Sequence, residues 1–244
     1  RMAEPKRPSS PAAVNRNLAP QPVQVDKSLV TLHQPHSFEA EQFRMLRTNI
    51  LFPKPGSPTP RIILVTSALP GEGKSFVSSN LAITIAQNVD KHVLLIDADM
   101  RRPTIHALFG FGSVNGLSNY LTHGQPLSEL LLRSNIPRLS FLPGGPIPSN
   151  PAELLSSKRM IALLQEVKNR YDDRYIIVDS PPPHLTSEGS ALAKFVDGII
   201  LVTKLGSTPK KLVTQLIETF EKSNIIGMVA NHLDNGALSH YGSD

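Results

Sequence analysis

Residues 61–75, with the sequence RIILVTSALPGEGKS, decide the fold of this chain. Residues 62–66 are apolar or β-branched, which is typical of a buried strand. The strand leads into a glycine-bearing turn that ends in Lys74 and Ser75, and a helical pattern follows. This order of elements predicts a phosphate-binding loop, although the strict motif begins with Gly and this one begins with Ala68. The alternative is a tight strand–helix turn with a chance Lys-Ser pair.

A loop of this kind binds a polyphosphate through its backbone and through the helix that follows it. Its backbone N–H groups converge on the anion, and the positive end of the following helix adds to the attraction. Lys74 is expected to reach the β- and γ-phosphates of ATP, and the Ser75 hydroxyl to coordinate Mg²⁺. The predicted ATP-binding residues of the loop are Pro70, Gly71, Glu72, Gly73, Lys74, Ser75 and Phe76.

Composition excludes several classes of protein. The chain has 244 residues, no cysteine and a net charge of +5. It has no apolar run of about 18 residues, which a membrane-spanning helix needs. Without cysteine it has no disulfide and no thiolate metal site, as a reducing cytoplasm would permit. The charge is too small to predict binding to nucleic acid, and the eight histidines lack metal-ligand spacing.

The chain divides into three predicted segments. Residues 1–36 are proline-rich and poor in large apolar residues, so we expect them to lack fixed structure. Residues 37–234 form the predicted globular domain, which opens with a helix capped by Ser37. Residues 235–244 are expected to form a flexible tail.

Apolar strands alternate with helices from Ile62 onward. This alternation predicts an α/β fold with a mostly parallel sheet and helices on both faces. The expected strands are 62–66, 93–97, 138–142, 175–179, 198–203 and 225–230. The expected helices are 75–88, 103–109, 127–133, 151–170, 187–195 and 209–223.

Two further strands end in carboxylates. The strand at 93–97 runs into Asp97 and Asp99, and the strand at 175–179 ends in Asp179. Ligands of parallel sheets bind at the carboxyl ends of the strands, so we expect these side chains beside the phosphates. Such carboxylates can hold Mg²⁺ or accept a proton from an attacking hydroxyl. A polar loop with internal ion pairs and a strand-capping Asp are the structural alternatives.

Three segments together resemble the Walker A, A′ and B motifs of the bacterial tyrosine kinases. They are ALPGEGKS at 68–75, LLIDADMR at 94–101 and IVDSPP at 177–182. The resemblance extends over residues 38–234 and implies a P-loop NTPase of the deviant-Walker type. It implies ATP-dependent tyrosine autophosphorylation with Mg²⁺ in capsule or exopolysaccharide synthesis. The implied catalytic residues are Lys74, Asp97, Asp99 and Asp179, and the implied metal ligands are Ser75, Asp97 and Asp179.

The resemblance also implies assembly and partners. Glu41, Arg44 and Arg47 match the family's N-terminal oligomerisation helix, although Glu41 and Arg44 could equally form a solvated ion pair. We therefore expect a homo-oligomer, closed as a ring. The implied partners are the cytoplasmic segment of a membrane-anchored chain-length regulator (a polysaccharide co-polymerase) and a phosphatase. The kinase would be cytoplasmic and recruited to the inner face of the membrane.

Three residues receive more specific expectations. Arg101 lies beside the predicted phosphates, and Asn231 follows the last strand, where a related Asn reads adenine in similar ATPases. A turn-forming Asn is the alternative for Asn231. Tyr241 is the expected phosphate acceptor, reached by a neighbouring subunit, because the tail around it has few apolar residues. The family usually ends in a tyrosine cluster, whereas this tail holds Tyr241 alone.

Other functions fit the sequence less well. A partitioning or positioning ATPase of the MinD/ParA type shares the three strand-end motifs, but it carries an extra Lys early in the loop, where this chain has Leu69. A scaffold that binds nucleotide without turnover is disfavoured because the catalytic residue types are all present. A dinucleotide oxidoreductase is disfavoured because no G-x-G-x-x-G follows the first strand.

Overall fold

A seven-stranded sheet organises the computed structural model, which describes residues 24–88, 90–170, 174–183, 192–220 and 225–233. The strand order is β3-β4-β2-β5-β1-β6-β7, and of the six pairings only β3 with β4 is antiparallel. The strands are β1 Ile62–Ser67, β2 His92–Asp97, β3 Leu132–Arg133, β4 Leu139–Leu142, β5 Arg174–Asp179, β6 Gly198–Lys204 and β7 Ile225–Asn231. The predicted α/β class with a mostly parallel sheet is confirmed.

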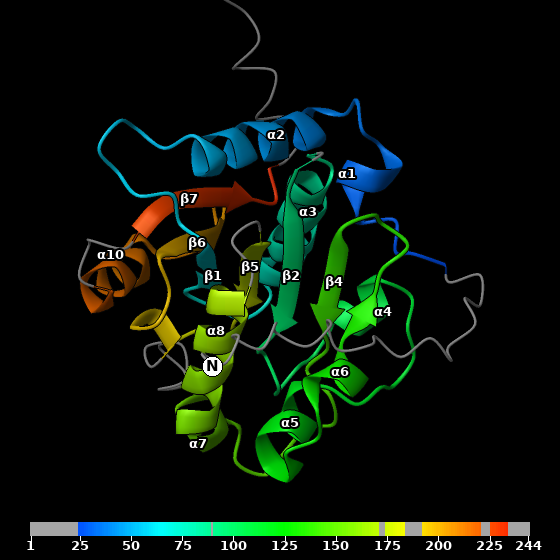
Figure 1. The fold of residues 1–244 in the computed structure, drawn as a ribbon. Helices are drawn as coiled ribbons and strands as arrows, with labels where there is room; N and C mark the ends of the chain where they lie inside the picture. Colours follow the sequence, from blue (N-terminus) through cyan, green and yellow to red (C-terminus); the bar gives the residue numbers. More distant parts are fainter. Residues whose placement is uncertain (1–23, 89, 171–173, 184–191, 221–224, 234–244) are drawn as a thin grey trace, which may run out of the picture.

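Helices cover both faces of the sheet (Figure 1). One face packs against α1 Val30–His33, α2 Phe38–Leu51, α3 Lys74–Ala86 and α4 Ile105–Leu108. The other packs against α5 Leu117–His123, α6 Leu127–Leu130, α7 Pro151–Leu155, α8 Lys158–Arg170 and α10 Lys210–Thr219. Successive residues of the central strands point to opposite faces, so Ile63 and Val65 belong to the first core and Ile62 and Leu64 to the second. Burial on both faces explains the continuous apolar runs of these strands.

The six expected strands are present, but two helix predictions need correction. The helix expected at 127–133 ends at Leu130, and β3 follows at Leu132. The helix expected at 151–170 is two helices, α7 and α8, separated at Ser156 and Ser157. A short antiparallel strand of two residues carries no periodicity that a sequence could reveal. Part of the helix expected at 187–195 lies outside the described residues.

The prediction for residues 1–36 is wrong in its last third. Leu29 is fully buried and α1 follows it. The backbone N–H of Thr31 donates to Oδ1 of Asn80 on α3 at 3.0 Å, and the N–H of Asp26 donates to the carbonyl of Leu108 at 2.9 Å. A few apolar residues and one buried amide therefore fix a segment whose composition alone suggested disorder. Ser37 caps α2 as predicted, because its hydroxyl accepts from the N–H of Ala40 at 3.1 Å.

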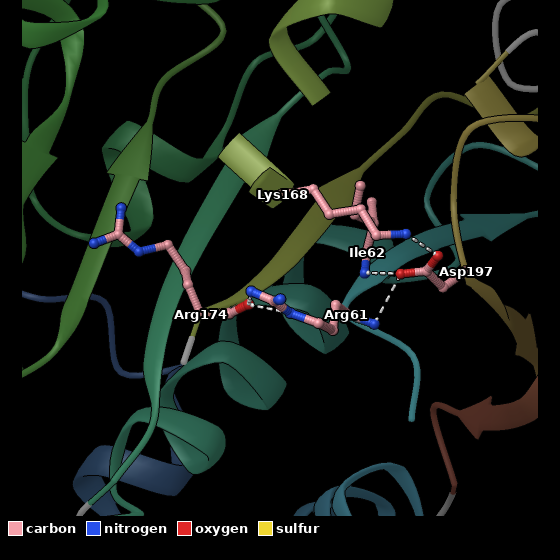
Figure 2. Close-up of polar contacts among 5 residues, drawn as sticks. All are labelled: Arg61, Ile62, Lys168, Arg174 and Asp197. Carbon is pink, nitrogen blue, oxygen red and sulfur yellow. Dashed lines mark hydrogen bonds and ion pairs between the residues drawn. The ribbon is translucent and has the colours of Figure 1, made fainter. Parts of the chain in front are cut away.

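Asp197 fixes the beginning of β1, the strand that carries the phosphate loop at its other end (Figure 2). Its Oδ2 accepts from the backbone N–H groups of Arg61 at 3.0 Å and Ile62 at 2.9 Å. Its Oδ1 pairs with Nζ of Lys168 on α8 at 2.5 Å. Burial acts to raise the pKa of Asp197, but these hydrogen bonds outweigh burial and lower it. Asp197 thus ties α8 and the start of β6 to the central strand.

Candidate nucleotide and metal site

The loop between β1 and α3 has the backbone conformation that a phosphate-binding loop needs. Gly71 and Gly73 have φ angles of +77° and +92°, which side-chain-bearing residues rarely adopt. Gly73 is the N-cap of α3, so the positive end of this 13-residue helix opens onto the loop. Lys74 is the first residue of the helix and is buried. The two glycines are required here because the chain must turn sharply between a buried strand and a buried helix.

Two carboxylates meet beneath this loop. Asp97 and Asp179 end the adjacent parallel strands β2 and β5, where they are register partners, and both are fully buried. The Ser75 hydroxyl donates to Oδ2 of Asp179 at 2.5 Å. Oδ2 of Asp97 accepts from the N–H groups of Thr104 at 2.9 Å and Ile105 at 3.0 Å, at the beginning of α4. The sequence predicted this meeting from strand ends alone, and the register realises it.

Among the residues that the structure describes, each carboxylate has one oxygen without a hydrogen-bond partner, Oδ1 of Asp97 and Oδ1 of Asp179. Burial raises the pKa of Asp179 to about 6, against the lowering effects of Lys74 and of the Ser75 hydrogen bond. Burial, and then the charge of Asp179, raises the pKa of Asp97 well above its ordinary value. A cation between the two carboxylates would remove both penalties.

These donors fit Mg²⁺ held together with a nucleotide. Mg²⁺ is commonly bound through one or two carboxylates plus substrate phosphates. Among the described residues no group of three or more His, Cys, Asp or Glu side chains could hold a metal ion alone. The two unpartnered oxygens and the Ser75 hydroxyl supply a partial shell of hard oxygen ligands, which phosphate oxygens and water would complete.

A cavity of about 640 Å³ lies against the loop. Its lining residues are Pro70, Gly71, Gly73, Lys74, Ser75, Phe76, Asp99, Arg102, Thr104, Leu108, Asn231 and His232. A cavity of this size is in the range of small-molecule sites. Its lining comes from the carboxyl-terminal side of three strands: Lys74 begins the helix after β1, Asp99 follows β2 and Asn231 ends β7. Most of the predicted ATP-binding residues therefore line one cavity.

Two predicted ATP-binding residues lie differently from the rest. Arg101 is exposed and is not among the lining residues, whereas its neighbour Arg102 is. Glu72 is buried, with its carboxylate bonded to the N–H of Leu69 at 2.8 Å and to the hydroxyl of Thr208. Asn231 lines the cavity, but its Nδ2 donates to the carbonyl of Glu72 at 2.9 Å.

Sequence reasoning missed several lining residues. Thr104 and Leu108 come from α4 and the segment before it, and His232 follows β7 with a φ of +57°. Arg102 had a usable signal, because it belongs to the same Asp-x-Asp-x-Arg-Arg run as Arg101. The others carry no motif, and only the path of the chain brings them to the cavity.

The residues expected to mediate assembly all bond within the chain. Arg44 pairs with Oε2 of Glu41 at 2.5 Å, and its Nη1 donates to the carbonyl of Pro35 at 2.6 Å. Nη1 of Arg47 donates to the carbonyl of Thr84 on α3 at 3.3 Å. The Glu41–Arg44 pair is thus the i, i+3 ion pair that the sequence offered as the alternative to a role in assembly. Arg47 therefore links α2 to α3 by a hydrogen bond, whatever its role in assembly.

Of the four tyrosines, Tyr171 and Tyr241 lie outside the described residues, so the structure does not describe the expected acceptor. Tyr175 is buried at the beginning of β5, and Tyr120 lies half-buried on α5. Burial raises the pKa of both hydroxyls. Neither lines the cavity.

Comparison with known proteins decides the family. A family model described as "AAA domain" matches residues 60–231. The tyrosine-protein kinase YwqD of Bacillus subtilis is 37% identical over 220 residues, which are 89% of this chain and 91% of that protein. This chain belongs to the bacterial tyrosine kinases. The tyrosine-protein kinase CpsD of Streptococcus agalactiae serotype III is 36% identical over 205 residues, 83% of this chain and 85% of the relative.

Solved structures agree with this family assignment. The chimeric protein CapA2B2 superposes with a TM-score of 0.78 at 32% identity, over 87% of this chain and 93% of the other. The kinase domain of Escherichia coli tyrosine kinase ETK superposes with a TM-score of 0.77 at 31% identity, over 91% and 87% of the two chains. The septum site-determining protein MinD of Pyrococcus horikoshii, in complex with Mg-ADP, reaches 0.59 at 20% identity and shares the fold alone.

Within the described residues, no helix of this bacterial tyrosine kinase is both long and apolar enough to cross a membrane.

Proposed function

We propose that this bacterial tyrosine kinase transfers the γ-phosphoryl group of ATP to protein tyrosine, in the control of capsule or exopolysaccharide synthesis. One observation carries the proposal. Ser75 is hydrogen-bonded to Asp179 below the loop that holds Gly71 and Gly73. Asp97 is the register partner of Asp179, and one of its carboxylate oxygens has no hydrogen-bond partner among the described residues. Phosphoryl transfer depends chiefly on positioning and charge neutralisation, and this arrangement supplies both.

Each residue would have a distinct task. Lys74 and the loop N–H groups hold the phosphates, while Ser75, Asp97 and Asp179 hold Mg²⁺. When bound, Mg²⁺ neutralises charge on the β- and γ-phosphates. The acceptor hydroxyl has an ordinary pKa of roughly 10, so a base near it is required at neutral pH. Oδ1 of Asp97 and the half-buried carboxylate of Asp99 are the two candidates for that base.

We propose further that the acceptor is Tyr241 of a neighbouring subunit in a ring. A head-to-tail contact through α2 forms a closed ring when the rotation between successive subunits adds up to a full turn. Phosphate on Tyr241 would add a charge of about −1.5 to −2 and weaken the ring by repulsion. A phosphatase would reverse this step.

The activating partner proposed is the cytoplasmic segment of a membrane-anchored chain-length regulator, which would hold the kinase at the inner face of the membrane. Support comes from a relative described as a putative tyrosine-protein kinase in the cps region of Klebsiella pneumoniae and from the chimeric nature of CapA2B2. No role for nucleic acid is proposed.

The test is incubation of the chain with labelled ATP and Mg²⁺, with and without a candidate activator segment, followed by phosphoamino-acid analysis. Label on tyrosine, lost in Lys74→Met, is expected. Release of inorganic phosphate without phosphotyrosine would instead indicate an ATPase switch. Asp99→Asn separates the two candidate bases, because Asp99 is not a proposed metal ligand: loss of transfer with retained Mg²⁺–nucleotide binding identifies Asp99 as the base, and retained transfer leaves Asp97.

A mixing experiment tests transfer between subunits. A Tyr241→Phe chain that binds ATP is combined with a Lys74→Met chain, and phosphopeptides are mapped. Label on Tyr241 of the Lys74→Met chain supports the proposal. Label confined to Tyr120, Tyr171 or Tyr175 contradicts it.

A further inference from the structure

Glu72 is a buried carboxylate inside a loop built to bind an anion. It lies between Gly71 and Gly73, and its exposed fraction is 2%. The two glycines line the cavity and Glu72 does not. A carboxylate facing bound phosphates would repel them, and its position away from the cavity removes that conflict. We therefore look for the role of this carboxylate in contacts within the protein rather than in contacts with a ligand.

Both oxygens of Glu72 have partners. Oε2 accepts from the backbone N–H of Leu69 at 2.8 Å, which closes the loop onto its own beginning. Oε1 accepts from the hydroxyl of Thr208, a residue 136 positions later in the chain. The first bond is local and any acidic side chain at this position could make it. The second depends on the tertiary structure.

Thr208 links Glu72 to the end of β6, the strand next to β1. The N–H of Lys204, the last residue of β6, donates to Oγ1 of Thr208 at 2.8 Å. The hydroxyl has one proton and two acceptors within reach, the Glu72 carboxylate and the carbonyl of Lys204 at 3.1 Å. The carboxylate is the nearer acceptor and the charged one, so we assign the proton to Glu72, while the hydroxyl oxygen accepts from the N–H of Lys204. These two hydrogen bonds connect the end of β6 to the phosphate loop through the side chain of Thr208.

β7 reaches the same loop residue from its own end. Nδ2 of Asn231 donates to the backbone carbonyl of Glu72 at 2.9 Å. A Cβ on Gly73 would lie 1.9 Å from that nitrogen, so the amide is packed directly on the loop. Two strands beyond β1 thus fix Glu72, one through its carboxylate and one through its backbone.

We propose that Thr208 is a positioning residue of the nucleotide site: its hydroxyl, bonded to Glu72, holds the phosphate loop in its binding conformation. The inference rests on the proposed function only in that the loop binds nucleotide, and it requires no transfer to tyrosine. Hydrogen bonds to charged groups contribute more than neutral ones, so losing this bond has a measurable effect.

The test measures binding of Mg²⁺–ADP to the full chain by calorimetry. Thr208→Val keeps the shape and removes the hydroxyl, and we expect about tenfold weaker binding, the size typical of a hydrogen bond to a charged group. Thr208→Ser keeps the hydroxyl and should bind within about threefold of the parent chain. Ser207→Ala, at the exposed neighbouring position, is the matched control and should bind as the parent does.

Two further measurements separate positioning from general stability. The melting temperature without ligand should fall in Thr208→Val, because a buried carboxylate oxygen loses its partner. A purely general loss of stability would leave the increase caused by Mg²⁺–ADP unchanged, whereas positioning of the loop predicts that this increase shrinks. In a Glu72→Ala background, Thr208→Val should weaken binding by no more than about twofold, because the bond is already absent. Should Thr208→Val fail to fold, Thr208→Ala serves in its place.

Three results would overturn the proposal: parental affinity in Thr208→Val, equal losses in Thr208→Val and Thr208→Ser, or fully multiplicative losses in the double variant. Failure of the kinase proposal gives a different pattern. In that case nucleotide binds and responds to Thr208 as described, but no phosphotyrosine forms.

Discussion

Asp97 and Asp179 are register partners at the carboxyl ends of β2 and β5, and both are fully buried. Within the described part of the chain, each has one carboxylate oxygen without a hydrogen-bond partner. Two like charges in such a position destabilise the fold unless a cation or a proton lies between them. The nucleotide site is therefore strained electrostatically until it is filled. This strain can be measured.

Asp97→Asn should stabilise the ligand-free protein and abolish its response to metal. The amide can still accept from the N–H groups of Thr104 and Ile105 through its oxygen, while its NH₂ group faces Asp179. We expect the free energy of unfolding at pH 7.5 in EDTA to rise by about 1–3 kcal/mol, the equivalent of one or two pKa units. Thermal melts with and without Mg²⁺–ADP provide the measurement. Equal stabilisation of parent and variant by Mg²⁺–ADP would contradict the metal assignment.

The stability of the metal-free protein should depend on pH through Asp179. Its pKa is about 6 in the fold against an ordinary 3.8, so the folded state binds the proton more tightly than the unfolded chain does. The favourable contribution is complete below about pH 4 and is lost as the pH rises to about 6. The total loss is on the order of 3 kcal/mol. Mg²⁺ affinity should rise over the same interval, since metal and proton compete.

Urea unfolding of the parent and of Asp179→Asn, compared between pH 4 and pH 8, measures the titration of Asp179 together with its effect on Asp97, whose pKa the charge of Asp179 raises. Asp197, whose pKa is lowered, contributes with the opposite sign in both proteins and cancels in the difference. A difference that does not change with pH would rule out the raised pKa.

Lys74→Met should lower the rate of phosphoryl transfer by at least about 10²-fold, as loss of a preorganised charge partner does. The structure adds a second effect. Lys74 lowers the pKa of Asp179, so its removal should raise that pKa further and weaken Mg²⁺ binding at neutral pH. Single-turnover kinetics and metal titration separate the two effects. Undiminished transfer in this variant would exclude the site.

Gly73→Ala and Gly71→Ala form a matched pair. Both positions have positive φ angles, which cost a side-chain-bearing residue about 1–2 kcal/mol. A Cβ at Gly71 would have no heavy atom of the described residues within 4 Å, whereas one at Gly73 would lie 1.9 Å from Nδ2 of Asn231. We expect nucleotide affinity to fall much more in Gly73→Ala. Equal affinities of the two variants, measured by calorimetry, would mean that Asn231 does not pack on the loop in solution.

Assembly is best tested with Glu41 and Arg44 alone. Arg47 donates to the carbonyl of Thr84 on α3, so reversing its charge would disturb the fold as well as any interface. Glu41→Arg combined with Arg44→Glu preserves the possible internal pair but presents reversed charges to a neighbour. We expect a smaller mass by light scattering with an unchanged circular dichroism spectrum. Unaltered assembly would leave the pair as a surface feature.

The sequence by itself determined the class of fold and predicted which candidate site residues lie together. Strand ends in a parallel sheet lie at one edge, so Lys74, Asp97 and Asp179 could be expected together from their places after apolar runs. Local signals were also sufficient for the Ser37 cap and for the glycine-bearing turn that contains Gly71 and Gly73.

Only the tertiary structure decided which side chains face the cavity and which support it. The proximity of Thr208 to Glu72, or of Asn80 to Thr31, depends on how strands and helices far apart in sequence pack, and no local spacing encodes it. The same holds for Arg102 lining the cavity in place of Arg101 and for the order at residues 24–36. The physical reason is that motifs record backbone conformation and residue chemistry, whereas partners across a core are chosen by the packing of the whole chain.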